Sequence, residues 1–453
     1  MSTLIVKSLR SSAAWSAAGR IRISLRGRLS KLRPFSRDIL IGAVLAGFGF
    51  VGCYRIAQQL DPILFEYGVS GTGGVLLNTQ NLWFDGDPAK IVLMSEDRYA
   101  AKPLFTVKHP LYRSAAYALV YPLKRLGTER AARIWILPAL VASAWSVLIF
   151  ALLRLITGRH FDAVLLCLLA LTSASAMFWL VVPEVYSWGS ATIVTALCLA
   201  AVRNDRIASS AQYVIVSALT LSITVTNWMV GILVTFAKQA WRRALQSTVN
   251  AFVMVCVFWG VQKLFIPSSE FFLAFTLDPL DRAFVWHPDA RGPIAVLGSF
   301  LCHTMVMPAI HVQSTGAPLW YGMTTQASSP GSGTPWGVIA VAVWMALLAI
   351  GVYGIVTVRE HIVLRTTVAV AVILQLTLHL VYGRETFLYS LHYLPLLLAV
   401  VAIGALTRFR GVTLSLVGVL ILVGGINNWL LLTRAITIVK RVGFVADSLG
   451  ANP

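Results

Sequence analysis

Two aspartates separated by one glycine stand in the segment NLWFDGDPAK, soon after the first long apolar run of the chain. A tight turn here would point the carboxylates of Asp85 and Asp87 toward one place. One of them could then act as a general base, while the other orients an acceptor or holds a divalent cation. The same pattern is also typical of an Asx turn in a solvated loop. The position directly after an apolar run favours the chemical interpretation.

A lysine and a histidine stand before a proline at Lys108-His109-Pro110, where a short apolar segment begins. If Pro110–Leu126 is a helix, this spacing places a cation and an imidazole near free helix N–H groups, an arrangement that suits a phosphate. The alternative is a loop lysine that is attracted to lipid headgroups. The residues themselves leave both interpretations open.

Two later motifs carry isolated polar residues between apolar runs. Glu184 lies in VVPEVYSWG, and a carboxylate at such a junction is costly in a membrane protein unless it has a role. It could contact an acceptor or form an ion pair with Lys108 or Arg384. The motif YGRETFLYSLHYLP contains Arg384, whose planar guanidinium could bind a phosphate. The same motif contains His392, for which a hydrogen bond between buried helices is the other interpretation.

The elements that must position these residues are apolar. Hydrophobic residues make up 57% of the chain and charged residues 12%. Apolar runs of about 20 residues, the length that crosses a bilayer, recur from Ile39 to Ile436. The net charge of +19 comes from basic residues in short loops between these runs, which is typical of membrane topology rather than nucleic-acid binding. The five cysteines show no CxxC spacing, so neither a disulfide framework nor a thiolate metal site is indicated.

The predicted fold is an all-α, polytopic transmembrane helical bundle of about eleven spans, within a range of roughly nine to thirteen. Basic residues without any acidic residue before Asp38 place segment 1–38 in the cytoplasm, and residues 39–453 form the transmembrane domain. The two large extracytoplasmic loops are 61–130 and 267–336, and the C-terminus is expected outside. The expected spans are Ile39–Leu60, Ile134–Leu155, Ala163–Val182, Tyr186–Val202, Tyr213–Thr226, Trp228–Ala240, Val249–Ile266, Val338–Val356, Thr366–Tyr382, Phe387–Leu406 and Leu414–Leu432.

Two apolar segments are not counted as ordinary spans. Pro110–Leu126 is short and broken by Arg113 and Pro122, so we expect a helix that lies at the membrane interface. Ile294–Ile310, within the second large loop, is expected either as a helix at the surface or as a re-entrant segment.

The order of these motifs resembles the GT-C superfamily of integral membrane glycosyltransferases, especially the branch with glycosyltransferase family 39, the protein O-mannosyltransferases and the lipid A aminoarabinose transferases. The resemblance covers roughly Ile39–Arg206 well and the rest of the chain loosely. The family's acidic pair is adjacent, D-E, whereas this chain has D-G-D, and Leu111 replaces the second proline of H-P-P. The matching residues are Asp85 and Asp87, His109-Pro110-Leu111-Tyr112, Leu126-Gly127, Ala132-Arg133-Ile134-Trp135, Gly158-Arg159, Pro183-Glu184-Val185-Tyr186 and the late FLYSLHYLPLL.

The resemblance implies an enzyme that moves a hexosyl or pentosyl group from a polyprenyl-phosphate-linked donor to an acceptor hydroxyl on the extracytoplasmic face. The expected partners are this donor, the lipid bilayer and a glycan, lipid or protein acceptor, without nucleic acid; a divalent cation is the one cofactor considered. The expected location is a bacterial inner membrane, with the N-terminus in the cytoplasm. The implied site residues are Asp85 and Asp87 for catalysis, Lys108, His109 and Arg384 for the donor phosphate, and Glu184, Tyr186 and His392 for orienting the acceptor or a cation.

Two other functions compete with this interpretation. A transporter or flippase of lipid-linked sugars would carry charged or broken positions near mid-membrane in paired repeats, and no clear duplication is present in the sequence. A polysaccharide polymerase or ligase usually has its main loop late in the chain, whereas the acidic loop is early here. The crowding of polar residues into outer loops favours a transferase.

Overall fold

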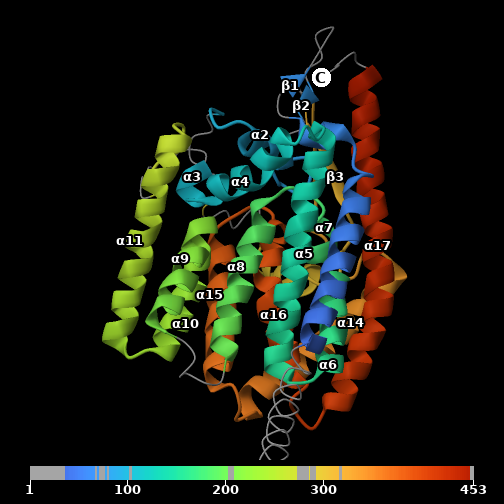
Figure 1. The fold of residues 1–453 in the computed structure, drawn as a ribbon. Helices are drawn as coiled ribbons and strands as arrows, with labels where there is room; N and C mark the ends of the chain where they lie inside the picture. The colour runs from blue at the N-terminus through green and yellow to red at the C-terminus, as the bar shows by residue number, and fades with distance from the viewer. Residues whose placement is uncertain are drawn as a thin grey trace, which may run out of the picture. The chain divides into compact units, whose positions relative to one another are not determined.

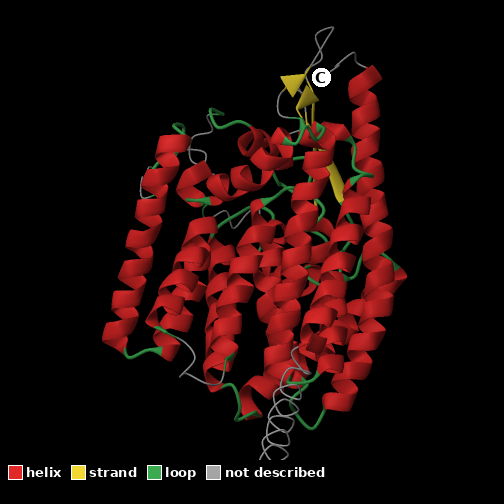
Figure 2. Ribbon diagram, in the orientation of Figure 1, coloured by secondary structure: helices red, strands yellow, loops and turns green. Residues whose placement is uncertain are grey.

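The computed structural model describes most of the chain and is mostly helical (Figure 2). The chain divides into two compact units, Met1–Leu45 and Ala46–Pro453, and the helix Ser36–Ala57 begins in the first unit and ends in the second. The site described below belongs to the second unit. The described residues are 36–66, 69–70, 77–78, 81–100, 105–202, 209–272, 285, 292–315 and 319–448.

Within the described ranges, seven helices are long and apolar enough to cross a membrane. This finding confirms an all-α protein of the membrane type. The seven are Ser36–Ala57, α5 (Arg130–Thr157), α11 (Trp241–Phe265), α14 (Pro335–Thr357), α15 (Ile362–Val381), the segment Thr386–Gly404 formed by η4 (Thr386–Tyr389) and α16 (Ser390–Gly404), and α17 (Arg410–Ser448).

Shorter helices occupy the other four expected spans. They are α6 (His160–Leu171) with α7 (Ala174–Trp179), α8 (Val185–Ala201), α9 (Ser210–Ile223), and η2 (Val225–Asn227) with α10 (Trp228–Lys238). The expectation of one continuous helix over Ala163–Val182 is wrong, because the chain breaks between α6 and α7. Ser173 caps α7 by accepting a hydrogen bond from the Ala176 N–H at 3.2 Å, and Asn428 of α17 donates to the freed carbonyl of Thr172 at 2.8 Å.

The segment Ile294–Ile310 is exposed at its start, at Ile294 and Leu297, and buried for most of its length from Ser299 onward. It forms α13 (Pro293–Gly298) and the π-helical turn η3 (Ser299–His303), and Phe300 and Met307 are fully buried. Its carbonyls bond to the break described above, since the Ala174 N–H donates to Met305 at 3.0 Å. The segment is therefore not a surface helix over its whole length, since the part from Ser299 onward is buried, as the re-entrant alternative expects.

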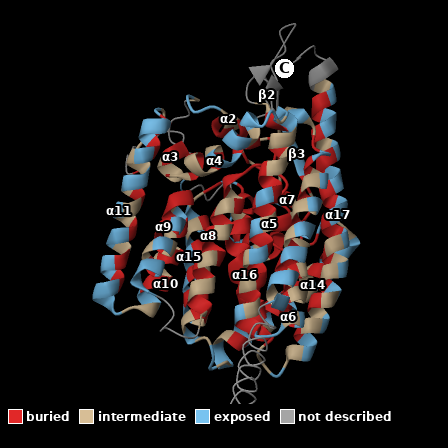
Figure 3. Ribbon diagram, viewed as in Figure 1, coloured by how far each residue is buried: buried red, intermediate tan, exposed pale blue. Residues whose placement is uncertain are grey.

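Helices α14 and α16 pack through small residues. A Cβ atom added at Gly351 of α14 would lie 2.7 Å from the backbone oxygen of Val400 and 2.8 Å from its carbonyl carbon. Small residues let helix backbones approach closely in membrane proteins, where van der Waals packing holds helices together. The segment Thr386–Gly404 is almost wholly buried as a result (Figure 3).

We expect Gly351→Ala to destabilise the protein by about 1–3 kcal/mol, because the added methyl meets backbone that cannot rotate away. Thermal unfolding in detergent should show a lower midpoint, Tm. Gly418→Ala on α17 is the matched control, since nothing lies within 4 Å of the added Cβ. Equal Tm values for the two variants would contradict this account of the α14–α16 contact.

Three short helices and a small sheet lie at one end of the assembly. The helices α2 (Pro88–Glu96), α3 (Phe105–Lys108) and α4 (Tyr112–Arg125) run across the ends of the long helices (Figure 1). The sheet has the order β1-β2-β4-β3, and β2 (Leu77–Asn78) pairs in parallel with β4 (Leu319–Thr324). The remaining elements are η1 (Pro62–Phe65), β1 (Val69–Ser70) and β3 (His311–Thr315). The pairing of β2 with β4 joins the two expected large loops.

Candidate functional site

The turn that carries Asp85 and Asp87 is held in a conformation that few residues adopt. Phe84 and Asp85 have φ angles of 50° and 62°, which is unusual for residues other than glycine. Phe84 is fully buried, and its ring contacts Phe178 and Phe387 at centroid distances of 5.6 and 5.5 Å. The burial of Phe84 therefore fixes the turn, and backbone strain of this kind is typical of functional sites.

Glu184 binds directly to this turn. It is the N-cap residue of α8, and its Oε1 accepts a hydrogen bond from the Asp87 N–H at 2.6 Å, while Oε2 accepts one from the Val185 N–H at 3.2 Å. A Cβ atom on Gly86 would lie 3.0 Å from Glu184 Oε1 and 2.9 Å from the Trp83 carbonyl oxygen. The glycine of D-G-D therefore gives Glu184 the room to approach the turn.

The buried position of Glu184 favours the protonated form of its carboxyl group. Burial raises its pKa to about 8, and the negative charge of Asp87 adds to the increase, while the N–H groups of Asp87 and Val185 act in the opposite direction. A carboxyl group with this pKa keeps its proton through most of the neutral range. Glu184 is therefore able to donate a proton or a hydrogen bond at neutral pH.

Asp87 pairs with a lysine that the sequence analysis did not select. The Lys90 Nζ lies 3.3 Å from Asp87 Oδ2, and both side chains are partly exposed. Lys90 also lies 5.6 Å from the centroid of the Phe105 ring. The sequence signal was present, since Pro88 is a typical first residue of a helix and Asp87 and Lys90 are then three residues apart on one face.

Lys108, in the second half of the first large loop, contacts the late motif. Its Nζ donates a hydrogen bond to the Tyr382 hydroxyl at 3.1 Å, across 274 residues of sequence. The ammonium also lies 5.8 Å from the centroid of the Tyr382 ring. The structure therefore brings the K-H-P and Y-G-R-E motifs together.

His109 is a neutral imidazole that is hydrogen-bonded within the protein. Its Nδ1 lies 2.9 Å from the Ile223 carbonyl oxygen and 3.2 Å from Thr224 Oγ1. Because a carbonyl oxygen only accepts, Nδ1 carries the proton and Nε2 is an acceptor. Burial, aided by the positive charges of Lys108 and Lys90, lowers the pKa of His109 to about 3, while the hydrogen bond to Ile223 acts in the opposite direction. The imidazole supplies no positive charge to a phosphate in this state.

The start of α4 is capped by another helix. The buried Gln262 of α11 accepts from the Ser114 N–H at 3.2 Å and donates to the Pro110 carbonyl at 2.8 Å. One helix N–H that the sequence analysis expected to be free for a phosphate is therefore used within the protein. A phosphate at this position would therefore have to be bound mainly by side chains.

Arg384 and Glu385 divide the late motif into an exposed and a buried part. Arg384 is exposed, whereas Glu385 is buried and accepts hydrogen bonds from the Thr324 hydroxyl at 2.6 Å and from the Thr325 N–H and hydroxyl at 3.0 and 2.8 Å. Burial raises the pKa of Glu385, while these hydrogen bonds act in the opposite direction. Glu385 therefore fastens the late motif to strand β4 of the second loop.

Tyr186 and His392 lie together below the turn. Their ring centroids are 5.4 Å apart, and Tyr186 also contacts Trp179 and Tyr389 at 5.8 and 5.4 Å. His392 is buried, and a Cβ atom on Gly189 of α8 would lie 2.4 Å from its Nε2. The pair connects α8 with α16 through a ring contact. The helix-to-helix hydrogen bond that the sequence analysis considered for His392 is not made through Nε2, which is buried and has no hydrogen-bond partner among the described residues.

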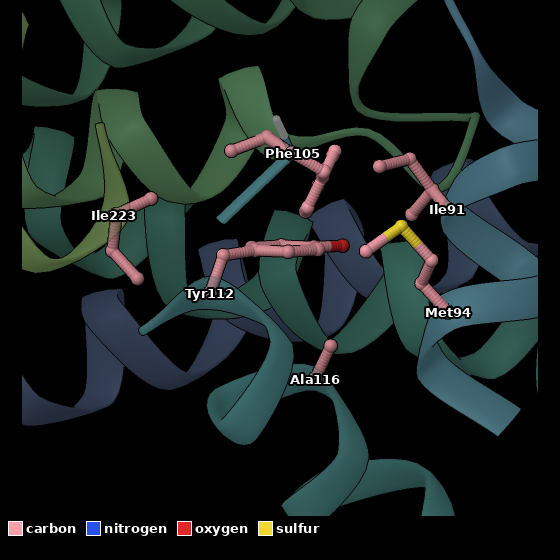
Figure 4. Packing of buried hydrophobic residues seen from close by; sticks show 7 residues of the cluster. Ile91, Met94, Phe105, Tyr112, Ala116 and Ile223 are labelled. Carbon is pink, nitrogen blue, oxygen red and sulfur yellow. The ribbon is translucent and has the colours of Figure 1, made fainter. Parts of the chain in front are cut away.

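A hydrophobic cluster supports this end of the protein. It joins α2, α3, α4 and the end of α9, and Figure 4 shows the Tyr112 ring among Phe105, Met94, Ala116 and Ile223. Tyr112 and Ala116 are fully buried. Because its members come from helices that carry Lys90 and Lys108, the cluster fixes the helices that position these two cations.

The structure thus joins four motifs that are far apart in the sequence. The D-G-D turn contacts P-E-V-Y through Glu184 and contacts the late motif through Phe387, which in turn accepts a hydrogen bond from Trp179 at 2.9 Å. K-H-P contacts the late motif through Lys108.

The acidic and basic residues at 278–291, which the sequence analysis assigned to the second loop, lie outside the described residues. Among those described, no group of three or more His, Cys, Asp or Glu residues could hold a metal ion.

Comparisons with protein-family models, with curated proteins and with solved structures find no match to this chain.

Proposed function

We propose that this protein is a membrane glycosyltransferase that moves a sugar from a polyprenyl-phosphate-linked donor to an acceptor hydroxyl. The observation that carries the proposal is the meeting of the D-G-D turn, Glu184, Lys108 and the late motif at one end of a helical membrane-type protein. A carboxylate base beside lysine and arginine side chains is the set of groups that such a transfer needs.

We assign the residues as follows. Asp85 accepts the proton of the acceptor hydroxyl, because it occupies the strained left-handed position of the turn. Asp87 pairs with Lys90 and binds Glu184 through its N–H, and in this assignment it supports the turn. Lys108 and the exposed Arg384 bind the leaving phosphate and stabilise its developing charge. Glu184 holds the turn and orients the acceptor, with Tyr186 and His392 behind it.

The finer topology belongs to the same proposal. Eleven spans of the GT-C type would include the shorter helices α6–α7, α8, α9 and α10 beside the seven long ones. The α5–α6, α14–α15 and α16–α17 connections, which contain Arg159, Arg359 and Arg408, and the start of α11, which contains Arg242, lie at the end opposite α2–α4 (Figure 1). By the positive-inside rule that end is cytoplasmic, so the site would face outward, as in a bacterial inner membrane.

The proposal is tested by measuring the lipid-linked sugars in cells that lack the protein. A transferase acts on a donor that already faces outward, so its loss should raise the amount of one lipid-linked sugar in the outer leaflet and remove one glycan product. Mass spectrometry of extracted lipids measures the amount, and oxidation of intact cells with impermeant periodate reports the leaflet. Accumulation in the inner leaflet would identify a flippase instead, and unchanged lipid-linked sugars would reject both functions.

A further inference from the structure

A groove between α9 and α11 lies at the end of the assembly opposite α2–α4 (Figure 1). Its volume is about 560 Å³. One wall is apolar, with Val214 and Ile215 from α9, and the other carries Arg243, Gln246 and Asn250 from α11. None of its lining residues belongs to the proposed transferase site.

The polar wall is unusual for a helix of this kind. Only 22% of the apolar part of α11 is buried within the protein, so most of this helix faces its surroundings. Gln246 and Asn250 are exposed, and Asn250 stands nine residues after the start of the helix, about 14 Å along its axis. Exposed polar side chains at that depth in a membrane helix are costly unless something polar covers them.

Charge and aromatic residues at the mouth of the groove indicate what could cover it. Arg243 lines the groove and is exposed, Arg242 lies 5.8 Å from the centroid of the Trp241 ring, and Trp241 itself is 65% exposed. Exposed tryptophan beside arginine is typical of the level of lipid headgroups. Basic residues at that level attract anionic lipids.

We propose that the α9–α11 groove binds one anionic phospholipid. Arg243 pairs with the lipid phosphate, Gln246 and Asn250 hydrogen-bond to the glycerol and ester oxygens, and an acyl chain lies along Val214 and Ile215. This order of groups matches that of the lipid headgroup, since Arg243 lies nearest the start of α11 and the two amides follow it along the helix. A bound lipid would also satisfy the two exposed amides of α11.

Native mass spectrometry of the purified full-length protein tests this assignment. The protein is exposed to mixed micelles with either phosphatidylglycerol or phosphatidylcholine, and the lipid that stays bound is counted. We expect selective retention of phosphatidylglycerol, and Arg243→Gln should weaken it by about five-fold, the effect of one arginine near an anionic headgroup. Asn250→Leu should weaken the binding of both lipids, because it removes a hydrogen bond to the shared glycerol backbone.

Arg242→Gln is the matched control, because it removes the same charge one residue away, outside the groove. It should weaken retention clearly less than Arg243→Gln does, because Arg242 does not line the groove. Equal losses in the two arginine variants would overturn the proposal in favour of a general surface charge effect, and equal retention of both lipids by the wild-type protein would also overturn it. A protein dimer that the wild type forms and Asn250→Leu does not would assign the groove to a second copy of the chain.

Discussion

Replacing Asp85 by asparagine is expected to lower the rate of glycan formation by at least about 100-fold, the usual effect of removing a general base. The substitution keeps the shape of the side chain and removes its ability to take the proton of the acceptor. Asparagine also tolerates the left-handed backbone that Asp85 adopts, so the turn should keep its conformation. The rate is measured in membranes by the conversion of the accumulated lipid-linked sugar to product, at matched protein levels.

The variant Asp87→Asn distinguishes the role of Asp87 from that of Asp85. The backbone N–H that binds Glu184 stays in place, and asparagine is a good residue before a helix, so the main loss is the ion pair with Lys90. A pair this exposed contributes little, and we expect a smaller loss of activity than for Asp85→Asn. Asp97→Asn, at the other end of α2, is the control and should retain wild-type activity. If Asp87→Asn were the more damaging variant, the base would be Asp87, and full activity of both would remove the turn from the mechanism.

The sequence was sufficient for the parts of the fold that the membrane dictates. A span must be apolar over its whole length, so the helical segments could be located from composition alone, and the polar residues between them marked the D-G-D turn and Glu184. The break at Thr172 could not be predicted in this way, because the partner that satisfies the freed carbonyl, Asn428, is 256 residues away.

Several details of the site could not be predicted from the sequence for the same reason. The protonation of His109 depends on a carbonyl 114 residues away, and the cap on α4 comes from Gln262. The anchoring of Glu385 to Thr324 and Thr325 depends on a strand pair that the all-helical interpretation did not contain. Local sequence indicates which residues are polar at a junction, whereas their partners decide their charge.

Glu184 gives the second large expected effect, a loss of stability as the pH rises. In the folded protein its pKa is raised to about 8 from an ordinary value of 4.5, so the folded state holds a proton that the unfolded state releases. This stabilisation is fully present below pH 4.5 and is lost as the pH rises through about 8. Each pKa unit corresponds to about 1.4 kcal/mol, so Glu184 should lower the Tm of the wild-type protein between pH 5.5 and pH 9, relative to a variant that has no titrating group at position 184.

Glu184→Gln should remove this fall. Its amide oxygen can still accept the Asp87 N–H, whereas the Val185 N–H loses its acceptor. Because the amide has no proton to lose, the Tm of the variant should fall less than that of the wild type between pH 5.5 and pH 9, whatever the difference between them at pH 5.5. Glu96→Gln is the control, because Glu96 is bound to Arg133 at 2.9 Å and its replacement leaves Glu184 in place. This control should keep the wild-type dependence on pH. If Glu184→Gln lost as much stability as the wild type between the two pH values, the proton would not reside on Glu184, and its part in orienting the acceptor through a protonated carboxyl would have to be abandoned.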